Sequence, residues 1–411
     1  MGATDGAYVG IDISSRNTVL SIYNSNMDEP ATISTILGEE NYSIPTVLAK
    51  RVGMGQWFFG EEALKMSRLK EAVLVEELYN LALRDGQIFI DAENYSAREL
   101  LVIFFKKLFS IPGPMAALGE VEKLVICVEQ INLETMELMN YVASKLGIEH
   151  NHLMLIDRTE CFYYYALSQK PELFLYNVAL FDYSGNNMVS CTLNRNQSTR
   201  PQVITLNVIN HGEITENRDE LFDKVITDTF GSSLFSSVYL VGDGFDGEWM
   251  KLSLSHLCKG RKVFLGKNLY SKGACYGAYI KDGKRDWPFI YIGDNDLKLN
   301  LSIKILDNNV MKFFTLIDAG ESWYDAKGEC EVILDGEPEI EFFIQKPESR
   351  EAHSEVLELT DLPKRENRTT RLRIEARPVS DVDVAITITD LGFGEISPAS
   401  GKCWEHTITT K

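Results

Sequence analysis

The chain has 411 residues, of which 45% are hydrophobic and 25% are charged, and its formal net charge at pH 7 is −19. This length allows two or three domains, each large enough to bury its own core. The acidic balance argues against a general nucleic-acid-binding protein, which needs a basic face. Apolar runs stay shorter than the about 18 residues of a membrane span. We therefore expect neither nucleic acid nor a membrane as a partner.

The cysteines and the N-terminus indicate the cellular compartment. The seven cysteines are far apart in the sequence and form no CxxC pair. Most of them lie inside apolar patterns, which is typical of reduced core residues. The first residues lack a basic region followed by an apolar stretch, so we expect no signal peptide. Together these features predict a cytoplasmic protein without structural zinc.

The first predicted element is a β-hairpin at residues 8–24, YVGIDISSRNTVLSIYN. Its first strand is apolar and closes with Asp12 and Ile13, and the turn that follows is polar. Exposed N–H groups in such a turn, with a carboxylate at the strand end, could seat a phosphate and its metal. In the alternative interpretation, Asp12 only caps its own turn. The polar residues of the turn are Ser14, Ser15, Arg16 and Asn17.

The next segments alternate between strands and helices. This order is typical of an α/β sheet with right-handed crossover connections. A helix is also predicted to begin near Gly60, after a strand that ends at residue 59. Strands are predicted at residues 32–37, 43–48, 121–128 and 153–156, and helices at residues 97–109, 133–146 and 160–169.

A second hairpin, at residues 177–193, repeats the first at an offset of 170 residues. Its turn contains Ser184, Gly185 and Asn186, and residues of this kind tolerate a positive φ. The repeat is too long for a solenoid. It predicts two similar lobes, the second beginning near residue 172, which face one another across a cleft. Three polar positions coincide: Asp12 with Asp182, Ser14 with Ser184 and Asn17 with Asn187.

The second lobe continues with the same kinds of element. Its last buried strand ends in a glycine-rich turn, Gly242-Asp243-Gly244, and a helix follows. Small residues gather on one side of a final helix around residues 272–279. The other predicted elements are strands at residues 203–208 and 236–241, and helices at residues 218–230 and 249–258.

Beyond residue 280 the pattern changes to strands alone. Turn signals separate these strands at regular intervals, which indicates an all-β sandwich. We therefore predict an α/β domain over residues 1–283, a linker over 284–296 and a β-sandwich over 297–411. Eight strands are predicted, at residues 297–305, 311–316, 328–334, 340–345, 354–359, 371–376, 384–389 and 404–409.

These features resemble the DnaK-type (seventy-kilodalton heat-shock) chaperones of the actin-like ATPase superfamily. Gly10-Ile11-Asp12 resembles the first phosphate motif, and FDYSG at residues 181–185 resembles the second. VGDG at residues 241–244 is similar to the adenosine motif. LELTDLP at residues 357–363 resembles a turn of the substrate-binding sandwich. The similarity extends over nearly the whole chain.

The resemblance implies an α/β actin-like (ribonuclease-H-like, duplicated) ATPase domain followed by an all-β sandwich. It implies ATP or ADP with Mg²⁺ in the cleft. Asp12 and Asp182 would be the catalytic residues and would hold Mg²⁺ through water. The nucleotide would be contacted by both turns and by the adenosine motif, that is by Ser14, Ser15, Arg16, Asn17, Ser184, Gly185, Asn186, Gly242, Asp243 and Gly244.

The chemistry departs from the family in several places. The first turn lacks glycine, so its side chains would crowd a nucleotide. Arg158 stands at the position that matches the family's water-orienting glutamate, and the catalytic lysine has no clear match. Residues 194–237 form a short segment, so the subdomain on the adenine side is reduced. ATP hydrolysis is therefore expected to be weak at most.

Two functions remain open at this point. An ATP-linked chaperone would hold an extended peptide in the sandwich by β-augmentation and pass the nucleotide state through the linker. A catalytically inactive pseudo-ATPase would instead be a scaffold whose sandwich binds a protein client. We find no helical lid after the sandwich, so a bound peptide would exchange fast. A sugar or acetate kinase is a third alternative, but such enzymes carry no sandwich.

Overall fold

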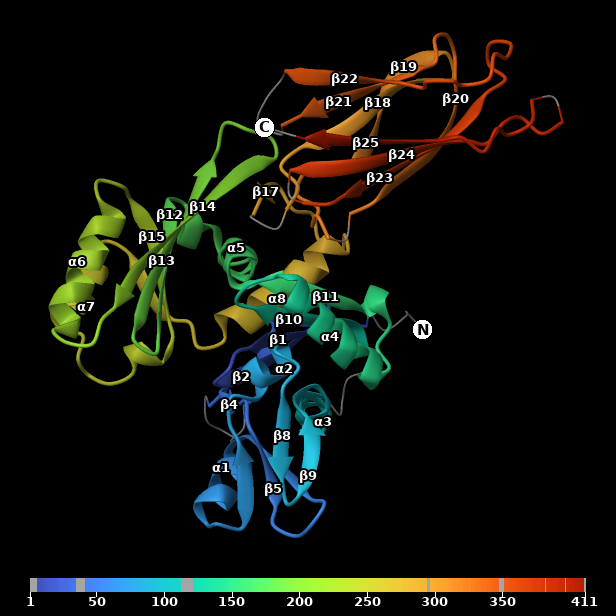
Figure 1. Cartoon of the computed structure of the whole chain (residues 1–411). Coiled ribbons are helices and arrows are strands. Elements are labelled where there is room, and N and C mark those ends of the chain that lie inside the picture. The colour runs from blue at the N-terminus through green and yellow to red at the C-terminus, as the bar shows by residue number, and fades with distance from the viewer. Residues whose placement is uncertain are drawn as a thin grey trace. The chain divides into compact units, whose positions relative to one another are not determined.

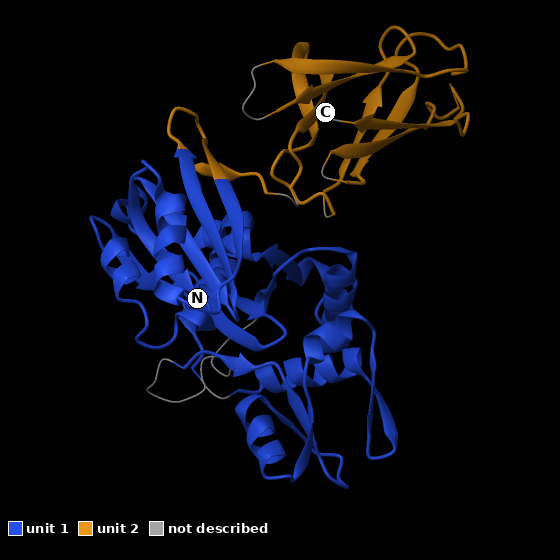
Figure 2. Ribbon diagram, turned by 60° about the vertical axis from the view of Figure 1, so that its left-hand side comes forward, with its two compact units in different colours: residues 1–195, 206–287 blue, residues 196–205, 288–411 orange. Residues whose placement is uncertain are grey.

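The structure is a computed structural model that describes residues 6–34, 41–111, 121–293, 296–324, 326–346, 351–380, 382–395 and 397–409. Its chain divides into two compact units (Figures 1 and 2). Unit 1 consists of residues 1–195 and 206–287, and unit 2 of residues 196–205 and 288–411. The change of unit after residue 287 falls in the segment predicted as the linker.

The first half of unit 1 is built on a mixed sheet in the order β11-β10-β1-β2-β3, with β4 also paired to β2. The central strand β1 pairs in parallel with β10 and in antiparallel fashion with β2. Nearly every residue of β1 is buried, as its apolar sequence predicts. The strands are β1 (Ala7–Ile13), β2 (Asn17–Tyr23), β3 (Ala31–Thr32), β4 (Ile44–Pro45), β10 (Val121–Val128) and β11 (Leu153–Asp157).

The strand predicted at residues 32–37 is present only as β3, and residues 35–37 of it lie outside the described residues. The strand predicted at residues 43–48 is divided between β4 and β5 (Leu48–Arg51). The helix predicted at residues 133–146 is present as α4 (Leu133–Leu146), which has a capping box at Asn132 and is followed by Gly147, whose φ is +76°. These local signals explain why its bounds were predictable.

Short elements form a small outer layer of this half. The sheet β6-β5-β7 packs on α1, and the hairpin β8–β9 lies in sequence between α2 and α3. We did not predict β7, α2, β8 and β9, since none has more than six residues, too few to establish a period. The bounds are β5 (Leu48–Arg51), β6 (Trp57–Phe59), α1 (Gly60–Arg68), β7 (Ala72–Val75), α2 (Leu78–Leu83), β8 (Gln87–Ile90), β9 (Glu93–Ser96), α3 (Ala97–Phe109) and α4 (Leu133–Leu146).

The second half repeats the pairing of the first. Its sheet has the order β16-β15-β12-β13-β14-β17, and β12 pairs in parallel with β15 and in antiparallel fashion with β13. Asp12 faces Val19 on β2, and Asp182 faces Val189 on β13, so the offset of 170 residues holds across both hairpins. The strands are β12 (Asn177–Ser184), β13 (Asn187–Asn196), β14 (Gln202–Glu213), β15 (Phe235–Val241), β16 (Lys262–Leu265) and β17 (Phe289–Tyr291).

Side-chain caps set where two helices begin. The Asp157 carboxylate accepts a hydrogen bond from the N–H of Glu160, so α5 starts at residue 158 and not at the predicted 160. The Asp219 carboxylate accepts from the N–H groups of residues 251–253, so α7 is shorter than predicted. The helices from residue 158 onward are α5 (Arg158–Leu167), which follows β11, then α6 (Arg218–Phe230), α7 (Leu252–Leu257) and α8 (Leu269–Lys281).

Helix α8 packs directly on β1 and α5 (Figure 1). Small residues make this close approach possible. A Cβ atom added to Gly273 would lie 2.1 Å from the carbonyl oxygen of Cys161, and one added to Gly10 would lie 2.3 Å from that of Ser271. The small side of this helix, which was predicted from the sequence, is therefore a packing surface.

Unit 2 contains two four-stranded antiparallel sheets, β19-β18-β21-β22 and β20-β23-β24-β25, around one apolar core. All eight predicted strands are present, although β18 begins at Asn300 and not at residue 297. Asn308 and Asn309 both have positive φ in the tight turn between β18 and β19. The strands are β18 (Asn300–Asp307), β19 (Val310–Ile317), β20 (Gly328–Ile333), β21 (Glu339–Gln345), β22 (Ala352–Glu358), β23 (Arg371–Pro378), β24 (Asp383–Asp390) and β25 (Cys403–Thr409).

Unit 2 also includes the tip of the β13–β14 hairpin. Residues 202–204 of β14 pair in parallel with β17, which the sequence did not indicate. Across the described ranges of the chain, no helix is both long and apolar enough to cross a membrane.

Candidate functional site

Asp12 and Asp182 lie near the ends of the two central strands of unit 1, and one arginine lies beside both. The Nε atom of Arg158 is 3.5 Å from Asp12 Oδ1, and its Nη1 atom is 3.9 Å from Asp182 Oδ2. Arg158 is the first residue of α5, directly after β11. The structure thus brings the two predicted catalytic aspartates together, with a guanidinium group between them.

Tyr270 of α8 completes this group. Its hydroxyl donates a hydrogen bond of 2.8 Å to Asp182 Oδ2, and the hydroxyl of Ser184 donates to Asp182 Oδ1. The guanidinium carbon of Arg158 lies 5.1 Å from the centre of the Tyr270 ring, within the range of a cation–π interaction. We call Asp12, Arg158, Asp182 and Tyr270 the cleft cluster.

Within the cleft cluster, Asp12 and Arg158 are held together by charge and not by a directional hydrogen bond. Asp12 Oδ1 and Arg158 Nε are both buried and have no hydrogen-bond partner among the described residues. Burial raises the pKa of the Asp12 carboxyl, although the Arg158 charge opposes this shift. Burial alone would lower the pKa of Arg158, but the Asp12 and Asp182 carboxylates and Tyr270 raise it above its usual value. Arg158 therefore remains a cation.

The N–H groups of the first turn donate hydrogen bonds inside the turn itself. The Ser14 hydroxyl oxygen accepts hydrogen bonds from the N–H groups of Arg16 and Asn17, at 3.4 and 3.1 Å. The same hydroxyl donates to the carbonyl oxygen of Asn17. Ser15, which was also predicted to contact nucleotide, is half-buried beside them. Two donors expected to face a phosphate are thus already bonded inside the turn.

Asp243 plays the corresponding role at the second turn. Its carboxylate accepts a hydrogen bond of 2.7 Å from the N–H of Gly185 and forms an ion pair of 3.3 Å with Arg16. The glycines beside it serve packing: a Cβ atom on Gly242 or on Gly244 would lie 2.4 Å from Tyr183. The predicted adenosine turn therefore packs against the second hairpin and bonds to both turns.

A pocket of about 330 Å³ opens next to this turn. Arg218, which the sequence reasoning missed, forms part of its wall. The Arg218 guanidinium lies 4.4 Å from the centre of the Trp249 ring and 5.2 Å from that of Tyr183. Four predicted residues line the pocket, whereas Asp12 and Asp182 do not. The lining residues are Tyr183, Gly185, Asn186, Ile214, Thr215, Arg218, Asp243, Gly244 and Asp246.

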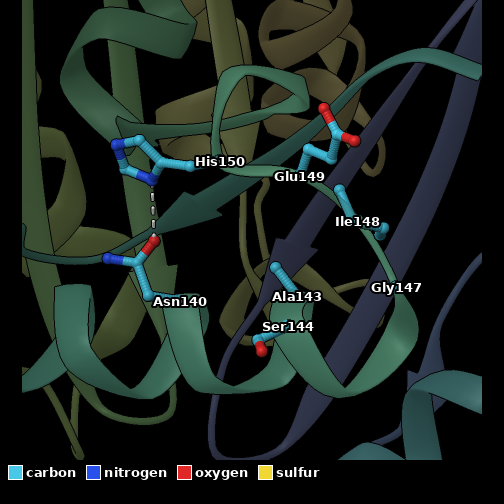
Figure 3. A pocket seen from close by; sticks show the side chains of 7 residues that line it. All are labelled: Asn140, Ala143, Ser144, Gly147, Ile148, Glu149 and His150. Carbon is cyan, nitrogen blue, oxygen red and sulfur yellow. Dashed lines mark hydrogen bonds between the residues drawn. The ribbon is translucent and has the colours of Figure 1, made fainter.

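A second pocket, of about 530 Å³, lies at the C-terminal end of α4 (Figure 3). It is lined by the last turns of this helix and by the segment that follows it, up to His150. The Nδ1 atom of His150 lies 3.2 Å from Asn140 Oδ1. None of the residues predicted to form the site lines this pocket, so it adds nothing to the nucleotide hypothesis.

The cleft cluster does not fit the Mg²⁺ ion that the family resemblance implies. A dication between Asp12 and Asp182 would stand beside the Arg158 cation, and like charges at this distance repel. Both carboxylate oxygens of Asp182 already accept hydrogen bonds. Within the described residues, no group of three or more His, Cys, Asp or Glu side chains could hold a metal ion.

Sequence reasoning located the aspartates and noticed Arg158, but it missed Tyr270 and the role of Ser14. Tyr270 is a single aromatic residue at the start of a helix, and such residues are usually core residues. Asp243 was predicted to contact nucleotide, but its bonds are to a backbone N–H group and to Arg16. No local sequence pattern indicates hydrogen-bond partners that lie so far away along the chain.

Comparison with known proteins gives families without an assigned function. A family model described as "Family of unknown function (DUF5716) C-terminal" matches residues 29–294, which is more than half of the chain. A second, described as "Domain of unknown function (DUF8552)", matches residues 296–410. No curated protein matches the sequence.

Proposed function

We propose that this chain, which belongs to the family described as DUF5716 C-terminal, is a protein-interaction scaffold. In this proposal an actin-like domain, related to DnaK-type chaperones, does not turn over ATP. The β-sandwich binds an extended segment of a partner protein. The observation that carries the proposal is the apolar outer face of the sheet β19-β18-β21-β22.

The actin-like part of the proposal is supported by the duplication inside unit 1. Each half has a central strand that pairs with a returning hairpin strand on one side and with a parallel strand on the other. Asp12 and Asp182 occupy the same register position in both halves. A duplicated α/β sheet with facing hairpins is the architecture that the resemblance implies.

The absence of ATP turnover is supported by the contacts that the aspartates and the two turns already make. Nucleotide hydrolysis in such a cleft relies on a metal ion and on N–H groups that receive phosphate oxygens. Here Arg158 lies between the aspartates, and Ser14 and Asp243 accept hydrogen bonds from the turn N–H groups. A nucleotide with Mg²⁺ bound at the aspartates and the turns would compete with these contacts.

The apolar outer face belongs to β18, β19 and β21. Leu301 and Ile303 point into the core, so Lys304 and Leu306 point outward. Phe313 lies opposite Lys304 and is 58% exposed, and its ring centre is 5.0 Å from that of Phe343. Met311, opposite Leu306, is also exposed. We call Leu306, Met311, Phe313 and Phe343 the apolar patch.

The other sheet of the sandwich has a different outer face. Arg373 there forms ion pairs with Glu329 and Glu331, at 3.3 and 3.0 Å. Such a charged face is typical of a surface in contact with water, whereas exposed aromatic side chains are typical of binding sites. The strand β19 also lies at the end of its sheet, where a partner strand can add by backbone hydrogen bonds.

The first prediction concerns nucleotide. Isothermal titration of the full chain with ATP up to millimolar concentration is expected to show no saturable heat, with or without Mg²⁺. The Asp12→Asn and Asp182→Asn variants should behave like the parent chain in this titration. Saturable binding that requires Mg²⁺ and is lost in either variant would contradict the proposal and favour the chaperone cycle.

The second prediction concerns the apolar patch. We expect the chain to bind a subset of an array of extended heptapeptides. Phe313→Ser is expected to weaken this binding by about tenfold, because it removes a central apolar anchor. Ile333→Ser is the matched control, since Ile333 is 51% exposed at the end of β20, in the other sheet. An equal loss in both variants, or no bound peptide, would refute the role of the patch.

A further inference from the structure

We infer that Arg158 is a built-in counter-ion that takes the place of a metal ion between Asp12 and Asp182. In this inference the two halves of unit 1 are joined at the cleft by a side chain of the chain itself. Contact between the two halves at this place then requires neither a divalent cation nor a nucleotide. The inference concerns how the fold is held together, so it goes beyond the proposed scaffold function.

The need for a cation follows from the two carboxylates. The duplication places Asp12 and Asp182 at the same position of two facing hairpins, one from each half. Two carboxylates that approach each other in a partly buried site repel unless a cation or a proton compensates them, and Arg158 is a cation beside both. The side chains of Asp12 and Asp182 are 15% and 14% exposed, so water screens them only in part.

The position of the Arg158 guanidinium is fixed by three elements. The residue directly follows β11, and the cap at Asp157 fixes the first turn of α5. Helix α5 packs on α8, where the backbones meet at Gly273. Tyr270 of α8 lies against the guanidinium and also donates to Asp182. An arginine with these constraints is part of the scaffold and is not a mobile surface side chain.

The distances from the Arg158 guanidinium to the two carboxylates indicate that it replaces a metal ion only in part. Its distances to the carboxylates are 3.5 and 3.9 Å, longer than charge-assisted hydrogen bonds of about 2.7–2.9 Å. Asp12 Oδ1 is buried without a hydrogen-bond partner among the described residues. When the guanidinium is removed, the two carboxylates should therefore gain capacity for another cation.

The test removes the charge of Arg158 and offers metal alone. In thermal unfolding without nucleotide, the midpoint of the parent chain should not respond to MgCl₂ or MnCl₂ beyond the effect of NaCl at equal ionic strength. Arg158→Gln should unfold at a lower temperature. Its midpoint should then rise saturably with the divalent salt, by about 3 °C at about ten times the dissociation constant.

Two further variants make the outcome specific. Arg158→Lys keeps a cation and should not respond to metal. Asp12→Asn with Arg158→Gln removes one of the carboxylates and should lose the response. If Arg158→Gln is unfolded without metal, refolding on addition of Mg²⁺ or Mn²⁺ supports the inference.

The inference is overturned if Arg158→Gln responds to metal no more than the parent chain does. It is also overturned if metal fails to refold this variant, or if the parent chain itself shows a saturable metal response. No nucleotide or peptide is present in these experiments. A negative result in these experiments can therefore be told apart from a failure of the proposed scaffold function, which would appear as ATP turnover or as an apolar patch that binds no peptide.

Discussion

Replacement of Arg365 by methionine is expected to lower the free energy of unfolding of the sandwich by about 3 to 5 kcal/mol. Two of its nitrogen atoms each lie 2.8 Å from an oxygen of the Asp390 carboxylate. Asp390 is 1% exposed and also accepts hydrogen bonds from Gly392 and Ser400. Removal of the arginine leaves a buried carboxylate without a counter-charge, and urea unfolding of the full chain measures the loss.

Arg368→Met is the matched control for this variant. Arg368 pairs with Asp335 at 2.9 Å, but both side chains are exposed and screened by water, so the loss should be far smaller than at Arg365. Equal losses in the two variants would show that burial does not decide the strength of these pairs.

The loss at Arg365 should also depend on pH. The hydrogen bonds from Arg365 lower the pKa of the Asp390 carboxyl below its usual value. A carboxyl whose pKa is lower in the folded state stabilises the fold above its unfolded pKa, near 4, and loses this contribution as the pH falls through its folded pKa. The difference between the parent chain and Arg365→Met should therefore be largest at neutral pH and shrink in acid.

Gly273→Ala is expected to destabilise unit 1 by about 1 to 3 kcal/mol, although the same change in an exposed helix stabilises by about 1 kcal/mol. The new Cβ atom would lie 2.1 Å from the carbonyl oxygen of Cys161, which is a backbone atom of α5. Helix α5 would have to move, and it carries Arg158 at its first residue. Thermal or urea unfolding of the full chain measures the change.

Gly277→Ala, in the same helix, provides the comparison. Its Cβ atom would lie 2.8 Å from a ring carbon of Tyr164, and a side chain can give way more easily than a backbone. We expect a clearly smaller loss at this position. If Gly273→Ala stabilises unit 1, or if Gly277→Ala is the more damaging variant, the close packing of α8 on α5 is refuted.

The amino-acid sequence alone determined most of the elements and the duplication of unit 1. The hairpins were predictable because a continuous apolar run and the turn-forming residues after it lie within a few positions of each other. The helix α4 was predictable from its cap and its terminal glycine. The equal spacing of Asp12 and Asp182 within their hairpins predicted that both hold the same register position, as they do.

Only the tertiary structure decided what the cleft contains. Asp243 bonds to Gly185 and Arg16, which are 58 and 227 positions away, and Arg158 lies beside carboxylates from both halves. Charged groups and hydrogen-bond donors pair with residues that are close in space but distant in the sequence. Local spacing therefore does not predict which residues will occupy a phosphate turn or a metal position. For this reason the same two aspartates that suggested a nucleotide site turned out to be the partners of an arginine.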